Sequence, residues 1–174
     1  MPTLEELAHE VAALRSRVDH AEAALAIHAL KARYAQLVDE RYLRGSVAAP
    51  EIVAARAEAL AALFSEDGVW DGGPALGVSR GRAEIAARMR APTLLFSWHF
   101  FVKPRIEVHS ADRASARWDI LAPCTPQSDP RPSWLVGFEE DEYARIDGVW
   151  LHTRMQLTTV FMAPHATGWQ KIIY

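Results

Sequence analysis

The sequence predicts an α+β fold in which helices cover one face of a curved antiparallel sheet. Apolar residues recur at helical spacing from Leu4 to about Leu43, whereas β-type runs separated by turn residues fill the chain after Phe96. Asp147-Gly148, between two of those runs, is the strongest short hairpin signal in the chain. Helices followed by successive strands are typical of this fold class.

The chain of 174 residues has the size of one ordinary domain, and it contains no internal repeat or long linker. We therefore expect one domain over residues 1–174, with residues 1–24 as a helical extension that takes part in self-association. Within the extension, Leu7, Val11, Leu14 and Val18 follow the spacing of two coiled-coil heptads.

The amino-acid composition excludes several classes of protein. The net charge of -3 and a 50% hydrophobic content argue against disorder and against a nucleic-acid surface. A lone cysteine, Cys124, excludes an intrachain disulfide framework. The charged N-terminus has no apolar signal core and no window is long enough to span a membrane, so we expect a cytoplasmic protein with a small-molecule partner.

The helices are expected as follows. Thr3 and Glu6 have the form of a capping box, which places the start of the first helix at Thr3. This helix is expected to extend to about Leu43, either continuous or broken once. A second helix is expected over Glu51–Phe64, and a third over Arg82–Arg90, stopped by Pro92.

Strands are expected from β-type residues bounded by turn residues. A short strand at Val69–Asp71 enters a turn at Gly72-Gly73-Pro74. The longer runs are Ser97–Val108, Ala114–Ala122, Trp134–Ile146 and Val149–Phe161.

Familiar catalytic motifs are absent: there is no Gly-rich phosphate loop, HExxH or GxSxG, and the seven histidines show no metal-ligand spacing. No metal site is expected. His99 stands out because it interrupts an aromatic strand, where a titratable group needs a partner or acts as one. Asp39 stands out because a carboxylate is disfavoured at the C-terminal end of a helix.

Two further polar residues attract attention. Asp119 interrupts an apolar run, where an acid is costly unless it is paired or functional. Arg154 could bind an anionic group or lie on the solvated surface, because strand alternation alone leaves open which face of Val149–Phe161 looks into a pocket.

In the order of these signals the chain resembles the SnoaL-like family of the superfamily named for nuclear transport factor two. The resemblance covers roughly residues 26–170. It rests on Ile27–Tyr34 leading to Asp39, Leu63–Trp70, Gly81–Ile85, His99 before Pro104–Val108, Ala116–Trp118, Asp141–Tyr143, Asp147–Trp150 and Pro164–Trp169.

The family resemblance implies a cone-shaped, cystatin-like α+β barrel. Within the superfamily, the chain is similar to the dehydratase branch, which includes bile acid dehydratase, scytalone dehydratase and hexachlorocyclohexane dehydrochlorinase. By that resemblance His99 is the base, Asp39 orients it, and Tyr34 stands where the dehydrochlorinase has a lysine, which favours dehydration. Asp119 falls near the place of a second pocket acid, and relatives form homodimers or homotrimers through the outer sheet face, where Trp118 and Trp134 would lie.

The expected activity is a cofactor-independent loss of water from a hydrophobic ring or steroid-like molecule. A neutral imidazole held by a carboxylate suits proton abstraction next to a carbonyl, and Tyr34 would donate a hydrogen bond to the departing hydroxyl or the enolate oxygen. The expected apolar lining is Trp70, Phe100, Phe138 and Phe161. An isomerase or cyclase on the same scaffold and a non-catalytic binding domain remain alternatives.

Overall fold

The fold was analysed in a computed structural model, which describes residues 1–165; Trp169 of the last expected motif lies outside these residues. The helices are α1 (Leu4–Asp39), α2 (Pro50–Ala61), α3 (Gly73–Leu76) and α4 (Gly81–Arg90). The strands are β1 (Tyr42–Leu43), β2 (Ser46–Val47), β3 (Phe64–Asp71), β4 (Val78–Arg80), β5 (Leu94–Ser97), β6 (Phe100–Val108), β7 (Arg113–Pro126), β8 (Ser133–Ile146) and β9 (Val149–Pro164).

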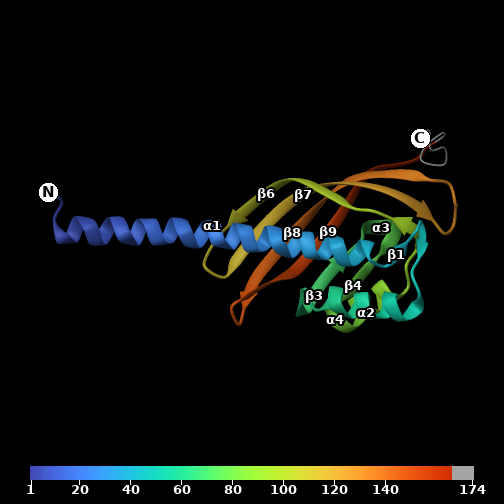
Figure 1. The fold of residues 1–174 in the computed structure, drawn as a ribbon, viewed down its shortest axis with the longest axis horizontal. Helices are drawn as coiled ribbons and strands as arrows, with labels where there is room; N and C mark the ends of the chain where they lie inside the picture. Colours follow the sequence, from blue (N-terminus) through green and yellow to red (C-terminus); the bar gives the residue numbers. More distant parts are fainter. Residues whose placement is uncertain (166–174) are drawn as a thin grey trace.

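The sheet curls around one end of α1. Its strand order is β4-β3-β9-β8-β7-β5, and β6 also pairs with β7. Figure 1 shows α1 crossing the concave side of the long strands, with α2 and α4 below β3. The expected α+β class with a curved sheet is thus confirmed, although β3 and β9 run parallel rather than antiparallel.

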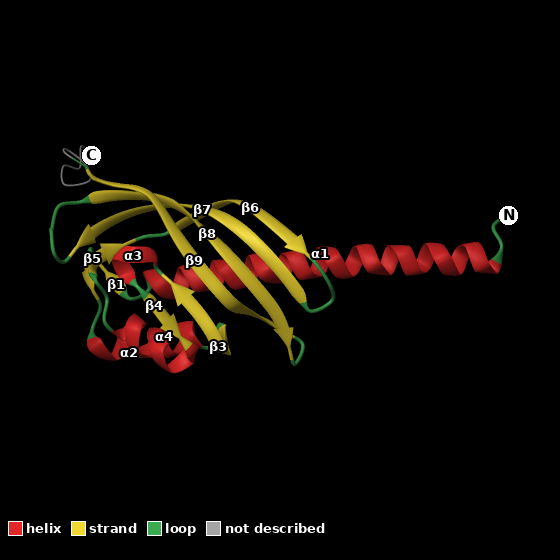
Figure 2. Cartoon of the chain, turned by 180° about the vertical axis from the view of Figure 1, so that it is seen from behind, coloured by secondary structure: helices red, strands yellow, loops and turns green. Residues whose placement is uncertain are grey.

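Helix α1 is continuous over its 36 residues. The side chain of Thr3 accepts a hydrogen bond from the backbone of Glu6, and the Glu6 carboxylate accepts one from Thr3, so the capping box is confirmed. The alternative of a helix broken once is excluded, and the helix ends at Asp39 rather than near Leu43. Its first part projects beyond the domain (Figures 1 and 2).

Several element boundaries differ from the expected ones. Helix α2 ends at Ala61, and β3 begins at Phe64, because Phe64 is fully buried and pairs with the last strand. The Gly72-Gly73-Pro74 segment opens the short helix α3 rather than a simple turn. The run expected from Ser97 to Val108 divides at Trp98-His99 into β5 and β6, which pair with different parts of β7.

The hairpin at Asp147-Gly148 is confirmed. Both residues have positive φ, 50° and 81°, which is the geometry of a tight two-residue turn that matches strand twist. Ile146 and Val149 face each other directly across it.

Two bulges on β9 reset its alternation. The register with β8 shifts between Glu142 and Tyr143, which leaves Thr153 unopposed, and again at Gly137, which leaves Val160 unopposed. As a result Trp150, His152 and Met155 are buried against the helices. The open question of which face of β9 looks inward is therefore answered differently before and after Thr153.

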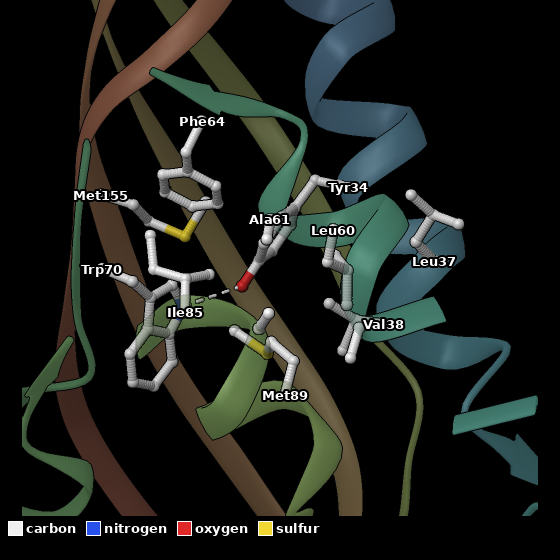
Figure 3. Packing of buried hydrophobic residues seen from close by; sticks show 12 residues of the cluster. Tyr34, Leu37, Val38, Leu60, Ala61, Phe64, Trp70, Ile85, Met89 and Met155 are labelled. Carbon is white, nitrogen blue, oxygen red and sulfur yellow. Dashed lines mark hydrogen bonds between the residues drawn. The ribbon is translucent and has the colours of Figure 1, made fainter. Parts of the chain in front are cut away.

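Buried side chains form two clusters along α1. One surrounds Tyr34, Phe64, Trp70 and Ile85, where α1, α2, α4 and β3 meet, and Figure 3 shows its packing. The other joins Ile27 with aromatic residues of β7, β8 and β9. Of the helices within residues 1–165, none combines the length and apolar character that crossing a bilayer requires.

Gly137 and Gly148 are required for different reasons, the first by close packing and the second by its backbone conformation. A Cβ on Gly137 would lie 2.3 Å from the carbonyl oxygen of Thr158, whereas one on Gly148 meets no atom within 4 Å. We expect Gly148→Ala to cost about 1–2 kcal/mol through its positive φ alone. Gly137→Ala should cost clearly more, because neighbouring backbone must move. Urea unfolding of both variants tests this order, and equal losses would contradict it.

Candidate active site

The site is built on Asp39 and His99, which are 60 residues apart in the sequence and in direct contact in the fold. Asp39 is the last residue of α1, and its carboxylate is almost fully buried. Its oxygens accept the backbone N–H of His99 at 3.1 and 3.2 Å, and Oδ1 lies 2.7 Å from His99 Nδ1. The carboxylate therefore holds both the backbone and the ring of His99.

This contact determines which ring nitrogen faces a ligand. When Nδ1 carries the proton that is donated to Asp39, Nε2 is unprotonated and can accept a hydrogen bond or a proton. Nε2 lies 3.4 Å from the Ser97 hydroxyl oxygen, and both residues line a pocket. His99 lies between β5 and β6, not within a strand as expected, and its ring stacks on Phe101 at an interplanar angle of 14°.

Tyr34 lies one and a half turns before Asp39 on α1 and is also buried. Its hydroxyl accepts a hydrogen bond from the Trp70 indole N–H at 3.0 Å, as Figure 3 shows. Burial, together with the nearby charge of Glu139, raises the pKa of Tyr34 well above its ordinary value. The phenol therefore stays protonated, and its own O–H remains available to donate.

The pocket is a cavity of about 100 Å³ that includes Tyr34, Trp70 and His99 in its wall. Val38, Ile120, Leu135 and Leu157 are among the apolar residues that complete it. Cys124 also lines it, but burial raises the pKa of this thiol to about 11, so it is not a thiolate near neutral pH.

The two arginines of the pocket wall are held by backbone carbonyls. Arg41 donates to the carbonyls of Val38 and Met89, at 3.2 and 2.9 Å, and Arg88 donates to the carbonyl of Leu76. These bonds fix the shape of the wall around α4.

Five residues expected in the site lie elsewhere. Asp119 and Phe138 are on the outer face of the sheet, where Asp119 binds Lys103 Nζ at 2.9 Å and Phe138 stacks under Arg117. Arg154 follows the bulge at Thr153, which turns it outward to bond Gln156.

The other two misplaced residues are aromatic. Phe100 and Phe161 are each about half exposed, and neither lines the pocket. Phe101, the neighbour of Phe100, is the residue that packs inward. Trp118, expected on the outer face, is buried instead and donates to the Tyr143 hydroxyl.

A buried charge cluster next to the pocket escaped sequence reasoning. Lys31 Nζ donates to Glu139 and, at 2.7 Å, to Asp141, and all three side chains are buried. Burial alone would lower the pKa of Lys31, but Asp141 and Glu139 raise it above its ordinary value. Glu139 also lines the pocket. The spacing 139/141 on one strand face was the signal available in the sequence.

His152 lies beside this cluster, fully buried among aromatic rings and stacked on Phe64 at a centroid distance of 5.1 Å. Neither ring nitrogen has a hydrogen-bond partner among the described residues. Burial and the charge of Lys31 lower the pKa of His152 well below its ordinary value. This histidine is therefore neutral in the folded protein near pH 7.

Within residues 1–165 no group of three or more His, Cys, Asp or Glu side chains is arranged to hold a metal ion. The functional groups that the structure brings together are thus an imidazole with its carboxylate, a phenol and a second carboxylate. The protein is thus of the curved-sheet α+β class, with His99, Tyr34 and Glu139 in the wall of one pocket and Asp39 bound to His99 behind it.

Comparison with protein families identifies the class. The sequence profile of the SnoaL-like domain matches residues 19–156, and the chain belongs to that family. No curated protein matches the chain.

Solved structures share the fold. A hexachlorocyclohexane dehydrochlorinase, LinA type 3 from Novosphingobium barchaimii, has a TM-score of 0.72 at 21% identity over 86% of this chain and 94% of its own. A Novosphingobium aromaticivorans protein provisionally assigned as a scytalone dehydratase has a TM-score of 0.70 at 21% identity, over 86% and 91%. A protein described as nuclear transport factor two-like with a cystatin-like fold, from the same species, has 0.61 at 24%, over 92% of each chain.

The burial of the His152 ring without a hydrogen-bond partner among the described residues predicts that the stability of the fold depends on pH. Because its pKa is depressed in the folded state, the unfolded chain binds a proton that the folded chain does not as pH falls below about 6.5, and stability falls with it. Replacing it by Phe, which fits among the rings, removes this loss. The stability of His152→Phe relative to the natural chain should therefore increase by about 1.4 kcal/mol per pH unit below 6.5.

Urea unfolding of both proteins between pH 7.5 and pH 5 measures that difference. The control is His109→Phe, because His109 is exposed and bonds the Ser115 hydroxyl at the surface. A stability difference that stays constant with pH would contradict the buried, neutral state of His152.

Proposed function

We propose that the protein is a cofactor-independent lyase that removes water from a small cyclic hydroxy-carbonyl compound. The observation that carries the proposal is the 2.7 Å contact between Asp39 Oδ1 and His99 Nδ1, which leaves Nε2 as a base on the pocket side. Membership of the SnoaL-like family and the fold shared with a dehydrochlorinase support it.

The proposed reaction begins at His99. Nε2 takes a proton from the carbon next to the substrate carbonyl, and the Asp39 carboxylate stabilises the imidazolium that forms. The electron pair moves through the enolate and expels the hydroxyl from the neighbouring carbon. The imidazolium returns its proton to that hydroxyl, so water leaves and His99 is neutral again.

Two pocket groups are proposed to hold the oxygens of the substrate. Tyr34, which stays protonated and accepts from Trp70, donates its O–H to the developing enolate oxygen. Glu139 binds Lys31 through Oε2 and keeps Oε1 for the O–H of the substrate. The donor and the acceptor would thus lie on different walls and orient the ring between them.

The cavity favours a small substrate. Pockets for drug-sized ligands usually measure about 300–1,000 Å³, whereas this one offers about 100 Å³. We therefore propose a single-ring compound rather than a steroid.

Two alternatives use the same residues differently. An isomerase or cyclase would share the proton abstraction without expelling a leaving group. A purely binding domain would not require a carboxylate on the distal side of the histidine, so the 2.7 Å contact favours an enzyme.

The first test follows the base directly. In D₂O, His99 should catalyse exchange of the hydrogen next to the carbonyl in cyclic 3-hydroxy ketones, which NMR detects together with loss of water. His99→Ala should lower both rates by about 10²–10⁴-fold. Asp39→Asn should lower them as well, because the amide no longer stabilises the imidazolium.

The matched control for this test is His109→Ala, since His109 is a surface histidine that does not line the pocket. It should exchange at the natural rate. Unchanged exchange in His99→Ala would refute the proposal. Exchange without loss of water across the compounds tried would favour the isomerase.

The second test compares two carboxylates on neighbouring strands. Glu139→Gln should raise KM for a hydroxy ketone about tenfold, because a charged hydrogen bond to the substrate becomes a neutral one. Asp119→Asn should leave KM unchanged, because Asp119 is on the outer face with Lys103. Equal effects of the two substitutions on KM would exclude the proposed role of Glu139.

A further inference from the structure

The first part of α1 has an apolar stripe that no other segment within residues 1–165 covers. The stripe consists of Leu4, Leu7, Val11, Leu14, Val18, Ala21 and Leu25. Its large side chains are between 42% and 87% exposed. Figures 1 and 2, seen from opposite sides, both show the start of α1 projecting beyond the sheet. Nearer the domain, Arg15, Asp19 and Glu22 border a groove with Ser110 and Arg145. Isolated helices of this length are marginal in water, so the stripe needs a partner surface.

The spacing of the stripe alternates between three and four residues along its whole length, which is the heptad pattern. Leu4, Val11, Val18 and Leu25 occupy the a positions. Leu7, Leu14 and Ala21 occupy the d positions. Valine at a central a position with leucine at d favours a two-stranded parallel coiled coil.

The flanking charges point to a second copy of the same chain. In a parallel pair, each g position faces the e position of the next heptad on the other helix. Glu10 at g then faces Arg15 of the second copy, and Arg17 at g faces Glu22. All four side chains are exposed, and none makes an ion pair within the described part of the single chain.

The chain's own domain does not block this face. Ala23 and Ile27 of α1 are buried against the sheet, while Leu25 between them is exposed. Residues two apart on a helix point about 200° apart, so the stripe faces away from the domain where the two overlap. The family profile begins only at residue 19, so most of the stripe is an addition to the domain.

We propose that two copies of this protein associate through a parallel coiled coil formed by residues 4–25 of α1. The two domains then lie at the same end of the coil. The pocket of each copy remains complete in its own chain.

Sedimentation equilibrium of the full chain tests the association. The natural protein should have twice the mass of one chain, and Leu14→Asp should have the mass of one chain at the same concentration. Ala13→Asp introduces the same charge at an exposed c position and should remain a dimer. A natural protein that is monomeric or trimeric, or a dimer that survives Leu14→Asp, would overturn the proposal.

Charge reversal tests the pairing. Glu10→Arg places like charges opposite each other twice in the dimer, which should weaken association about tenfold. Adding Arg15→Glu to the same chain should restore it. Failure of the double variant to recover would show that these two residues do not face each other.

A disulfide tests the direction of the helices. In a parallel coil, Leu7→Cys places the two new thiols together at a d position, and oxidation should link the dimer. Ala13→Cys, on the outside of the coil, should not link. A dimer that forms but does not link through Cys at position 7 would indicate another direction or another interface.

Discussion

The placement of α1 inside the curled sheet is the constraint on which the site depends, and the buried cluster of Lys31, Glu139 and Asp141 secures it. An ammonium group removed from water is costly unless it is paired and hydrogen-bonded, and Lys31 satisfies this requirement only at one depth and rotation of the helix. Tyr34 follows one turn later and Asp39 two turns later. The register that pairs Lys31 therefore also places the phenol and the carboxylate of the pocket.

Much of the fold could be predicted from local signals, because those signals involve residues close in sequence. The capping box at Thr3 and the hairpin at Asp147-Gly148 need only neighbouring residues, and both are present. The pairing of Asp39 with His99 is a contact across 60 residues. The local sequence context marked each residue as unusual, and only the family resemblance predicted that the two side chains pair.

The misplaced residues have a common physical reason. Alternation assigns strand residues to faces only while the register is unbroken, and the bulge at Thr153 sends His152 inward and Arg154 outward. The apolar neighbours of Asp119 in the sequence suggested a costly buried carboxylate. Its side chain instead lies on the outer face of the sheet, where Lys103 donates a hydrogen bond to it. Lys31 carried the opposite signal, since a lysine on an amphipathic helix is expected to be solvated, and the two acids that retain it lie more than a hundred residues away.

One helix thus serves two purposes on opposite faces. The inward face carries Ile27, Lys31 and Tyr34, and the outward stripe ends at Leu25. From Leu25 to Asp39 the helix rises about 21 Å, so the coiled-coil contact would end well before the His99 pair. Changes in the stripe can then alter association without altering the chemistry of the pocket, whereas changes at Lys31 affect the position of every α1 residue in the pocket.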